Sequence, residues 1–460
     1  MSLEEPWQGA ARPPAGEARD VAEIKPLSLR RNFAWTLVGT AVYLGSQMAM
    51  LSVLAKLTTK EAVGQFSLGQ ALCAPVVMFT NLQLRAIQAT DARDEFRFGD
   101  YLRLRLIGTA LAFATIAYLA FSGHDGTQRA LVVLAIGGAK CVESISDVIF
   151  GLWQKYERLD LIAKSYLIKG PASLLALAIV VYLTRNVVWA TVALLVVWSG
   201  LLLTYDCYFA RRLSRLHPAP PRPADDTRSP YRILWHLAWL ALPLGLVGLL
   251  DSLNLNMPRY VIQHVLGDAG LGFFAVISAF MVVGTSVVMA LVQSSSPRLA
   301  RYYVQDPPAF RKLLWRLLQI ALAMGVAGVA CAALFGRPVL ALVATPEYAA
   351  HNDALIWLMV AAGLGYVARF LIASMLAARR LRAQAPLYAA ALGVIAWLSH
   401  ALVPRWGLVG AAWAICAAMG VLLVGAAVIN LLALRARGEE PMSEAVPEAE
   451  TPLPQAGEQP

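Results

Sequence analysis

Apolar residues occur along this chain in blocks of roughly twenty, separated by short polar connectors. A helix that crosses a hydrocarbon core about 30 Å thick needs about twenty such residues. Only 15% of the 460 residues are charged, whereas a soluble domain has about 25%. The pattern therefore predicts an all-α, polytopic membrane protein.

Twelve blocks have the length and composition of a membrane span. Their approximate bounds are 33–55, 66–90, 104–121, 130–152, 165–184, 187–208, 234–255, 272–295, 313–335, 354–377, 386–403 and 407–434. The first block is longer than the apolar core of a cleavable signal peptide, so we expect it to remain as the first span.

The distribution of Lys and Arg predicts the orientation of these spans. With the N-terminus inside, every cytoplasmic segment carries at least two cations, whereas the outer segments after the first carry one each. This alternation follows the positive-inside rule. We therefore expect a multi-pass protein of the cytoplasmic (inner) membrane with both termini in the cytoplasm. The net charge of +10 is then explained by anionic lipid at the inner membrane edge, and no nucleic-acid partner is expected.

The longest inner loop, which contains HPAPPRPADDTRSP, divides the spans into six and six. The predicted organisation is a disordered cytoplasmic tail over 1–29, a six-helix bundle over 30–208, a cytoplasmic linker over 209–233, a second six-helix bundle over 234–437 and a disordered acidic tail over 438–460.

Two short segments suggest that the halves are repeats. Leu54–Phe66 and Ile262–Phe274 each follow the first span of a half and place Gly two residues before Phe, at an offset of 208. Chance is the alternative for so short a match. A parallel repeat is an arrangement in which transporters place the substrate site at the repeat interface.

The fourth span carries an unusual polar stripe. Its members recur at helical spacings of three and four and therefore share one face: Lys140, Glu143, Ser144, Asp147 and Gly151. Charged groups at this depth normally face protein or a watery cavity. The stripe is a candidate contact for substrate or a coupling ion. Alternatively, the stripe has a structural role, in which Lys140 pairs with Glu143 or Ser144 and Asp147 contacts and stabilises a neighbouring helix.

Arg85, Lys169 and Arg369 also lie within predicted spans. Arg85 and Arg369 are candidate substrate contacts, although Arg85 could instead extend to the cytoplasmic interface. For Lys169, just before Gly170-Pro171, extension to that interface is the favoured interpretation. The deep cations suggest an inner cavity suited to a phosphate or pyrophosphate.

In the seventh span, Asp251 and Asn254 share a face. We consider them candidates for an ion- or proton-linked role. The alternative is an ion pair between Asp251 and Arg259 near the outer end of the span.

Motifs for other chemistries are absent from the sequence. No lysine is preceded by Gly, so there is no GxxxxGK[ST] phosphate loop, and neither HExxH nor GxSxG occurs. The five cysteines lie in or beside apolar blocks without the spacing of metal ligands. We expect no enzyme activity, no cofactor and no metal.

Several segments together resemble a known family. The stretch RNFAWTLVGTAVYLGSQ…LAKL…VGQFSLGQALCAPVVMFTNLQLRAIQATD resembles the first two spans of bacterial polysaccharide exporters of the O-antigen flippase type. The segments CVESISDVIFGLWQKYERLDLIAKSYLIKG, LDSLNLNMPRYVIQHVLGDAGLGFFAVISAFMVV, SSSPRLARYY and ATPEYAAHNDALIWL resemble that family's corresponding regions. These exporters belong to the multidrug/oligosaccharidyl-lipid/polysaccharide (MOP) superfamily.

The resemblance implies two six-helix bundles around a central cavity. It also implies a flippase that moves oligosaccharide linked to undecaprenyl diphosphate across the cytoplasmic membrane by alternating access. Its partners would be the lipid-linked oligosaccharide, membrane lipid and other polysaccharide assembly proteins. Within matching segments, Arg85, Glu143, Asp147 and Asp251 are the candidates that it supports. A cation-coupled multidrug antiporter of the same superfamily is the main alternative, and a membrane glycosyltransferase is a third.

Overall fold

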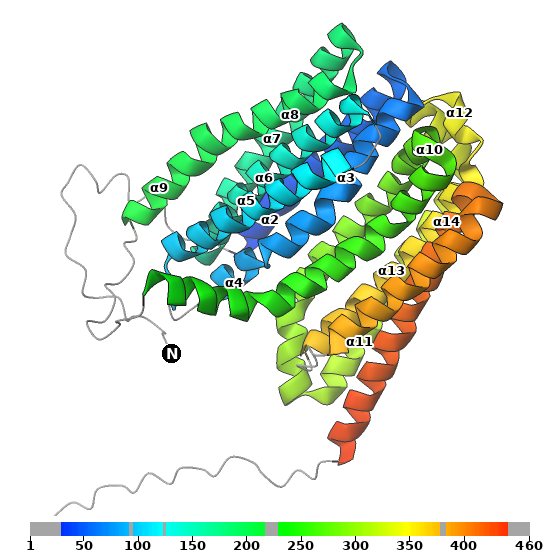
Figure 1. Ribbon diagram of the computed structural model, residues 1–460. Coiled ribbons are helices and arrows are strands. Elements are labelled where there is room, and N and C mark those ends of the chain that lie inside the picture. Colours follow the sequence, from blue (N-terminus) through cyan, green and yellow to red (C-terminus); the bar gives the residue numbers. More distant parts are fainter. Residues whose placement is uncertain (1–28, 92–94, 123–125, 217–228, 378–382, 440–460) are drawn as a thin grey trace, which may run out of the picture.

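The computed structural model describes residues 29–91, 95–122, 126–216, 229–377 and 383–439. These residues form helices and short connections, with no strand (Figure 1). The helices of the first half are α2 (Leu29–Leu57), α3 (Lys60–Asn81), α4 (Leu84–Thr90), α5 (Phe98–Ser122), α6 (Thr127–Lys155), α7 (Leu159–Thr184), α8 (Val187–Leu201) and α9 (Cys207–Leu216), with a π-helical turn at Leu202–Asp206. Those of the second half are α10 (Pro230–Gln305), α11 (Pro307–Val343), α12 (Pro346–Ala349), α13 (Asn352–Ala377) and α14 (Gln384–Glu439).

The helices account for all twelve predicted spans. Nine helical segments of the described residues are long and apolar enough to cross a membrane. Two of them each contain two spans, because α10 turns at Gly267 (φ 70°) and α14 turns at Gly407 (φ 58°), left-handed conformations that glycine adopts without strain. The remaining span is α6, which carries Lys140, Glu143 and Asp147 and is therefore too charged to qualify by composition alone.

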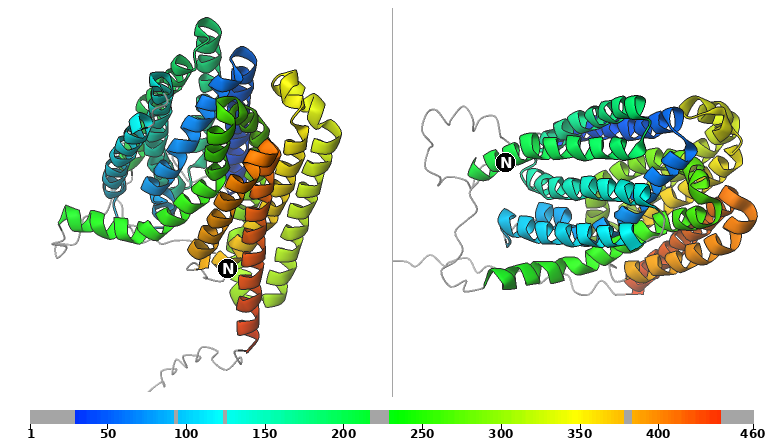
Figure 2. Two further views of the ribbon diagram at one scale, coloured as in Figure 1. Left: turned by 45° about the vertical axis from the view of Figure 1, so that its right-hand side comes forward. Right: turned by 45° about the horizontal axis from the view of Figure 1, so that its top comes forward.

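The chain is arranged as two groups of helices, α2–α9 and α10–α14 (Figures 1 and 2). They meet where the first part of α10 packs along α3. The predicted tails and the central part of the predicted linker lie outside the described residues. The chain is still helical through Leu216 and is helical again from Pro230.

The two groups approach each other most closely through equivalent residues of the suggested repeat. A Cβ on Gly64 would meet the backbone carbonyl of Asp268, and a Cβ on Gly272 would meet the backbone carbonyl of Lys60. Lys60 and Asp268 are themselves 208 positions apart, as are Gly64 and Gly272. The contact is therefore reciprocal, as expected if a two-fold axis relates the two halves.

Ion pairs join the groups at the same place, here named the Asp268 end. Both oxygens of Asp268 accept from Arg129 Nη2 at 3.0 Å. Lys60 Nζ lies 3.4 Å from Glu347 Oε2 and 5.4 Å above the Phe273 ring. Charged contacts and close backbone packing thus hold the halves together at this end.

The opposite end, here named the Asp160 end, contains the Arg158–Asp160 pair at 2.8 Å. There an apolar cluster connects the start of α10 to the first half. It includes Phe96, Leu104, Ile233 and Leu237.

We predict that Gly64→Ala destabilises the protein by about 1–3 kcal/mol, because its Cβ forces the Asp268 backbone away. The control is Gly420→Ala, since a Cβ at Gly420 meets nothing within 4 Å and alanine favours a helix. Thermal unfolding in detergent micelles measures both. Equal stability of the two variants would contradict the close approach at the Asp268 end.

Candidate functional site

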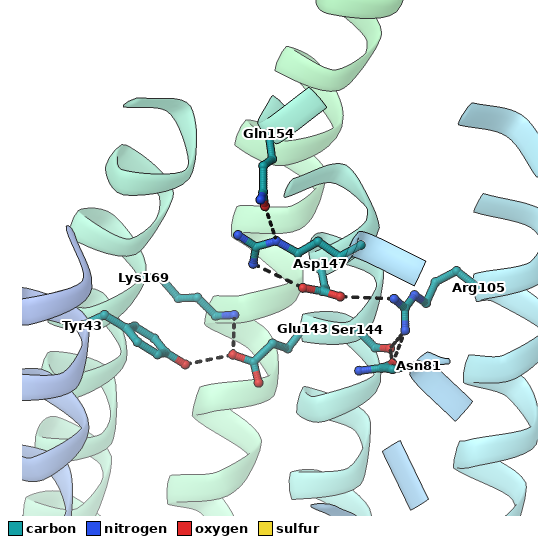
Figure 3. A network of polar contacts seen from close by, with 9 residues as sticks. Tyr43, Asn81, Arg105, Glu143, Ser144, Asp147, Gln154 and Lys169 are labelled. Atoms are coloured by element: carbon teal, nitrogen blue, oxygen red, sulfur yellow. Dashed lines mark hydrogen bonds and ion pairs between the residues drawn. The ribbon is translucent and has the colours of Figure 1, made fainter. Parts of the chain in front are cut away.

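The polar stripe of α6 lies among cations contributed by neighbouring helices (Figure 3). Around it the structure gathers four cations, two carboxylates and their neutral hydrogen-bond partners. We call the charged members the cationic cluster, and they are Arg85, Arg105, Lys140, Glu143, Asp147 and Lys169.

Asp147 is shared by two guanidinium groups. Arg85 Nη1 lies 3.4 Å from Asp147 Oδ1, and Arg105 Nη2 lies 3.1 Å from Asp147 Oδ2. Arg105 also donates to Ser144 Oγ at 3.2 Å and to Asn81 Oδ1. The fully buried Arg105 therefore connects α3, α5 and α6 at one point.

A break between α3 and α4 positions Arg85. The predicted span 66–90 is interrupted, because Leu82 and Gln83 both have φ of 51°, a conformation that non-glycine residues rarely adopt. The chain is thereby redirected just before Arg85, whose Nε donates to Gln154 Oε1 at 3.1 Å. Strained backbone of this kind is often retained at functional sites.

Glu143 is shared by two ammonium groups. Lys140 Nζ lies 2.8 Å from Glu143 Oε2, and Lys169 Nζ lies 3.3 Å from Glu143 Oε1. The Tyr43 hydroxyl donates to Oε1 at 2.9 Å (Figure 3). Both ammonium groups also lie over the Trp198 ring, Lys169 at 4.0 Å and Lys140 at 5.4 Å from its centroid. An electron-rich ring face favours a cation at that position.

The cationic cluster has an excess of positive charge, because four cations face only two carboxylates. Its members are not equally accessible. Arg105 and Lys169 are almost completely buried, whereas the side chains of Arg85, Lys140, Glu143 and Asp147 are between 25% and 31% exposed. The buried cations hold the carboxylates, while the partly exposed cations can contact a ligand. An anion is the ligand that this charge excess favours.

These contacts answer several expectations for the first half. The Lys140–Glu143 pair and the bracing role of Asp147 are both confirmed. The interpretation that Lys169 extends to the interface is wrong, because Lys169 is only 2% exposed and contacts Glu143. Arg85 likewise contacts Asp147 within the bundle.

The candidates of the second half do not join the cationic cluster. Arg369 Nη1 contacts Met289 Sδ at 3.6 Å, and Asp251 interacts with Arg369 electrostatically without an ion pair. The expected Asp251–Arg259 pair is not formed, because Arg259 donates to Asn256 Oδ1 at 2.8 Å instead. Asn254 donates to the backbone oxygens of Leu250 and Tyr388, so it fastens α10 to α14.

Four members of the network are not identifiable from the sequence. Arg105 lies at the start of a span, where a cation is expected at the membrane edge, Gln154 lies just beyond the end of one, and Tyr43 and Asn81 are ordinary residues of membrane helices. Only the proximity of α2, α3, α4 and α5 to α6 identifies their roles. The polar stripe itself was the one available signal, because its charges require partners.

An apolar groove lies beside this site. Its volume is about 540 Å³, and it lies between α3, α5 and the first part of α10. Its wall includes Phe79, Thr80, Leu111 and Leu249. Thr80 directly precedes Asn81, so one end of the groove lies next to the partners of Arg105.

The comparisons with known proteins agree with this architecture. No protein-family model matches the chain. Its sequence is 23% identical over 399 residues to the capsular polysaccharide biosynthesis protein CapF of Staphylococcus aureus, covering 86% of this chain and 97% of CapF.

Solved structures share the fold. An inward-facing multidrug resistance MATE family transporter of the MOP superfamily superposes with a TM-score of 0.69 at 15% identity, covering 88% of this chain and 100% of that one. A MOP superfamily transporter from Pyrococcus furiosus superposes with a TM-score of 0.62 at 18% identity, covering 88% and 94%. The chain therefore has the fold of these MOP superfamily transporters. The predicted fold class, of about twelve membrane helices in two bundles, is confirmed, and the chain is a multi-pass membrane protein.

Because Asp147 balances two guanidinium groups, we predict that Asp147→Asn lowers the free energy of unfolding by about 2–4 kcal/mol. Glu347→Gln is the control, since its pair with Lys60 is largely exposed and contributes less than about 1 kcal/mol. Thermal unfolding of both variants measures the difference. A loss for Asp147→Asn no larger than that for Glu347→Gln would show that Asp147 does not organise the cationic cluster.

Proposed function

We propose that this protein is a transporter of the MOP superfamily and acts as a flippase for polyprenyl-diphosphate-linked oligosaccharide in surface polysaccharide biosynthesis. It resides in the cytoplasmic (inner) membrane with both termini in the cytoplasm. The observation that carries the proposal is the excess of two positive charges in the cationic cluster, where four cations face two carboxylates.

The charge excess matches the substrate. A diphosphate that links a lipid to a sugar carries two negative charges, and Arg and Lys donate charge-assisted hydrogen bonds to its oxygens. The partly exposed Arg85 and Lys140 are the donors best placed to reach it. Tyr43, Gln154 and Asn81 supply further polar groups beside them.

The groove supports a lipid-linked cargo. Its wall is largely apolar, and one end lies next to Asn81 and the Arg105 contact. An amphiphile with its diphosphate at the cationic cluster therefore has an apolar surface beside it for the first part of its lipid chain. A water-soluble anion has no need of such a surface.

The packing at the Asp268 end supports alternating access. Ion pairs and glycine contacts close the halves there. In the proposed orientation the Asp268 end faces outward, so this conformation receives cargo from the cytoplasmic side. Separation at the Asp268 end then releases it to the outer leaflet.

The alternative is a cation-coupled multidrug antiporter, since MATE transporters share the fold. The charge of the cluster argues against it, because an excess of positive charge repels cationic drugs. In the P. furiosus transporter, reverse polarity of the binding pocket suggests a different function. The S. aureus relative is a capsular polysaccharide biosynthesis protein, which favours the flippase.

Removing a ligand-facing charge tests the proposal directly. We expect Arg85→Gln or Lys140→Gln to weaken transport of lipid-linked oligosaccharide by about 10- to 100-fold, the loss of one charge-assisted contact. Arg369→Gln, in the second half, tests whether the deep cation there contributes. Arg103→Gln is the control, because its side chain is 62% exposed and lies outside the cluster. Unchanged transport by both cluster variants at normal protein level would remove the basis of the proposal.

The groove generates a separate prediction. Leu111→Trp inserts a bulky ring into the groove wall and should slow transport, whereas Leu175→Trp on α7 should not. The two leucines are equally exposed, at 61% each, so the substitutions differ mainly in location. The measurement is movement of labelled lipid-linked oligosaccharide in proteoliposomes. Equal rates for the two variants would exclude the groove from transport.

Deletion distinguishes the proposed function from the alternatives. A flippase mutant should accumulate lipid-linked glycan on the cytoplasmic leaflet, and a multidrug antiporter mutant should instead become drug-sensitive. Sugar transfer by the purified protein would indicate the glycosyltransferase alternative. Drug sensitivity without glycan accumulation would overturn the proposal.

A further inference from the structure

Asp206 is a buried carboxylate of the first half that lies outside the cationic cluster. Asp206 ends the π-helical turn between α8 and α9 and is only 1% exposed. Ser146 Oγ of α6 donates to its Oδ2 at 2.7 Å, and Ser165 Oγ of α7 donates to its Oδ1 at 3.0 Å. Three helical elements therefore meet at this carboxylate.

The neighbours of Asp206 differ from those of the two cluster carboxylates. Glu143 and Asp147 each have two cations in contact, whereas no lysine or arginine of the described residues forms an ion pair with Asp206. A buried ionised carboxylate without an ion pair is costly. A serine hydroxyl, unlike an ammonium or guanidinium group, can donate to an ionised carboxylate or accept from a protonated one. This site can hold Asp206 in either form.

Asp206 is also connected to the cationic cluster. Ser146 lies on α6 between Glu143 and Asp147, and Ser165 lies one turn before Lys169 on α7. Lys169 contacts Glu143 and interacts electrostatically with Asp206. Lys169 therefore couples Asp206 electrostatically to Glu143 in the cluster.

Apart from Lys169, which forms its ion pair with Glu143, the groups that face Asp206 do not supply a fixed counter-charge. Its own element contributes Tyr205 and Cys207, α6 contributes Ser146, and α7 contributes Ser165 and Lys169. Arg158 and Asp160 act on Tyr205 and neutralise each other as an ion pair. The π-helical turn that contains Asp206 also supports a functional role for this residue, because such turns often occur at functional sites.

We propose that Asp206 is a proton-binding site that sets the net charge of the region around the cationic cluster and so links anion binding to protonation. The proposal rests on the proposed function, in which the cluster binds a diphosphate. With Asp206 ionised, three carboxylates oppose four cations, and with Asp206 protonated only two do. Proton binding therefore strengthens anion binding, and by linkage a bound anion strengthens proton binding to the same degree.

Infrared difference spectroscopy of the full chain in lipid nanodiscs tests the proton site without any substrate. A pH titration of the wild type should show a carboxylic acid C=O band that appears on acidification. Asp206→Asn should lose this band, since asparagine keeps the serine contacts but cannot titrate. Asp100→Asn, which replaces another buried carboxylate that is 3% exposed, should retain it. A band unchanged in Asp206→Asn would overturn the proposal.

A second variant guards against failure of Asp206→Asn to fold. Ser165→Ala removes one donor that stabilises the ionised form, so the midpoint of the band should move to higher pH. An unmoved midpoint would contradict the assignment of the band to Asp206.

Binding of citronellyl diphosphate-linked N-acetylglucosamine tests the linkage. This probe is a diphosphate diester, whose charge stays constant as the pH is changed. Wild-type affinity should fall on the order of tenfold as the pH rises through the transition of the band, while Asp206→Asn keeps the higher affinity throughout. The same pH dependence in both proteins would overturn the linkage. Absence of binding at every pH, with the band intact, would contradict the proposed function and support the proton site alone.

Discussion

Each of the two carboxylates on α6 is shared by two cations, and the first half of the protein is organised around these shared charges. Asp147 connects α6 to α4 and α5, and Glu143 connects it to α7 and, through Tyr43, to α2. A helix with the charges of α6 is poorly suited to lipid by itself. The cations of the neighbouring helices stabilise the two carboxylates of α6. Because the four cations of the cluster outnumber these carboxylates, a surplus of positive charge remains inside the bundle. The same cations thus stabilise the carboxylates of α6 and favour an anionic ligand.

The fold could be predicted from the sequence to a large extent, because bilayer thickness and the positive-inside rule constrain span length and direction. Twelve spans followed from these constraints, and the linker divided them into two groups. The turn at Gly267 falls between two predicted spans, and the turn at Gly407 falls at the first residue of the last one. The break at Leu82–Gln83 could not be predicted, since neither residue is a glycine or proline. Its left-handed conformation is stabilised by tertiary packing, which local sequence does not encode.

The candidate site was predictable only in part, for a similar reason. Lys140, Glu143 and Asp147 can be identified from the sequence, because their spacing of three and four residues places them on one helix face. Arg105 and Lys169 lie on other helices near span ends, where cations usually extend to the membrane edge. Asp206 has no periodic partner at all, and its surroundings become apparent only when α6, α7 and the π-helical turn are seen together.

The reciprocal contact of Gly64 with Asp268 and of Gly272 with Lys60 has a consequence for how the two halves diverge. It has the geometry of an isologous interface, in which two identical subunits present the same patch to each other. In a dimer of identical chains, every substitution is made twice, so a cluster of charges in one subunit must also appear in the other. Covalent fusion removes that obligation. One half of this protein carries the shared carboxylates and their cations, and the other half is not required to repeat them.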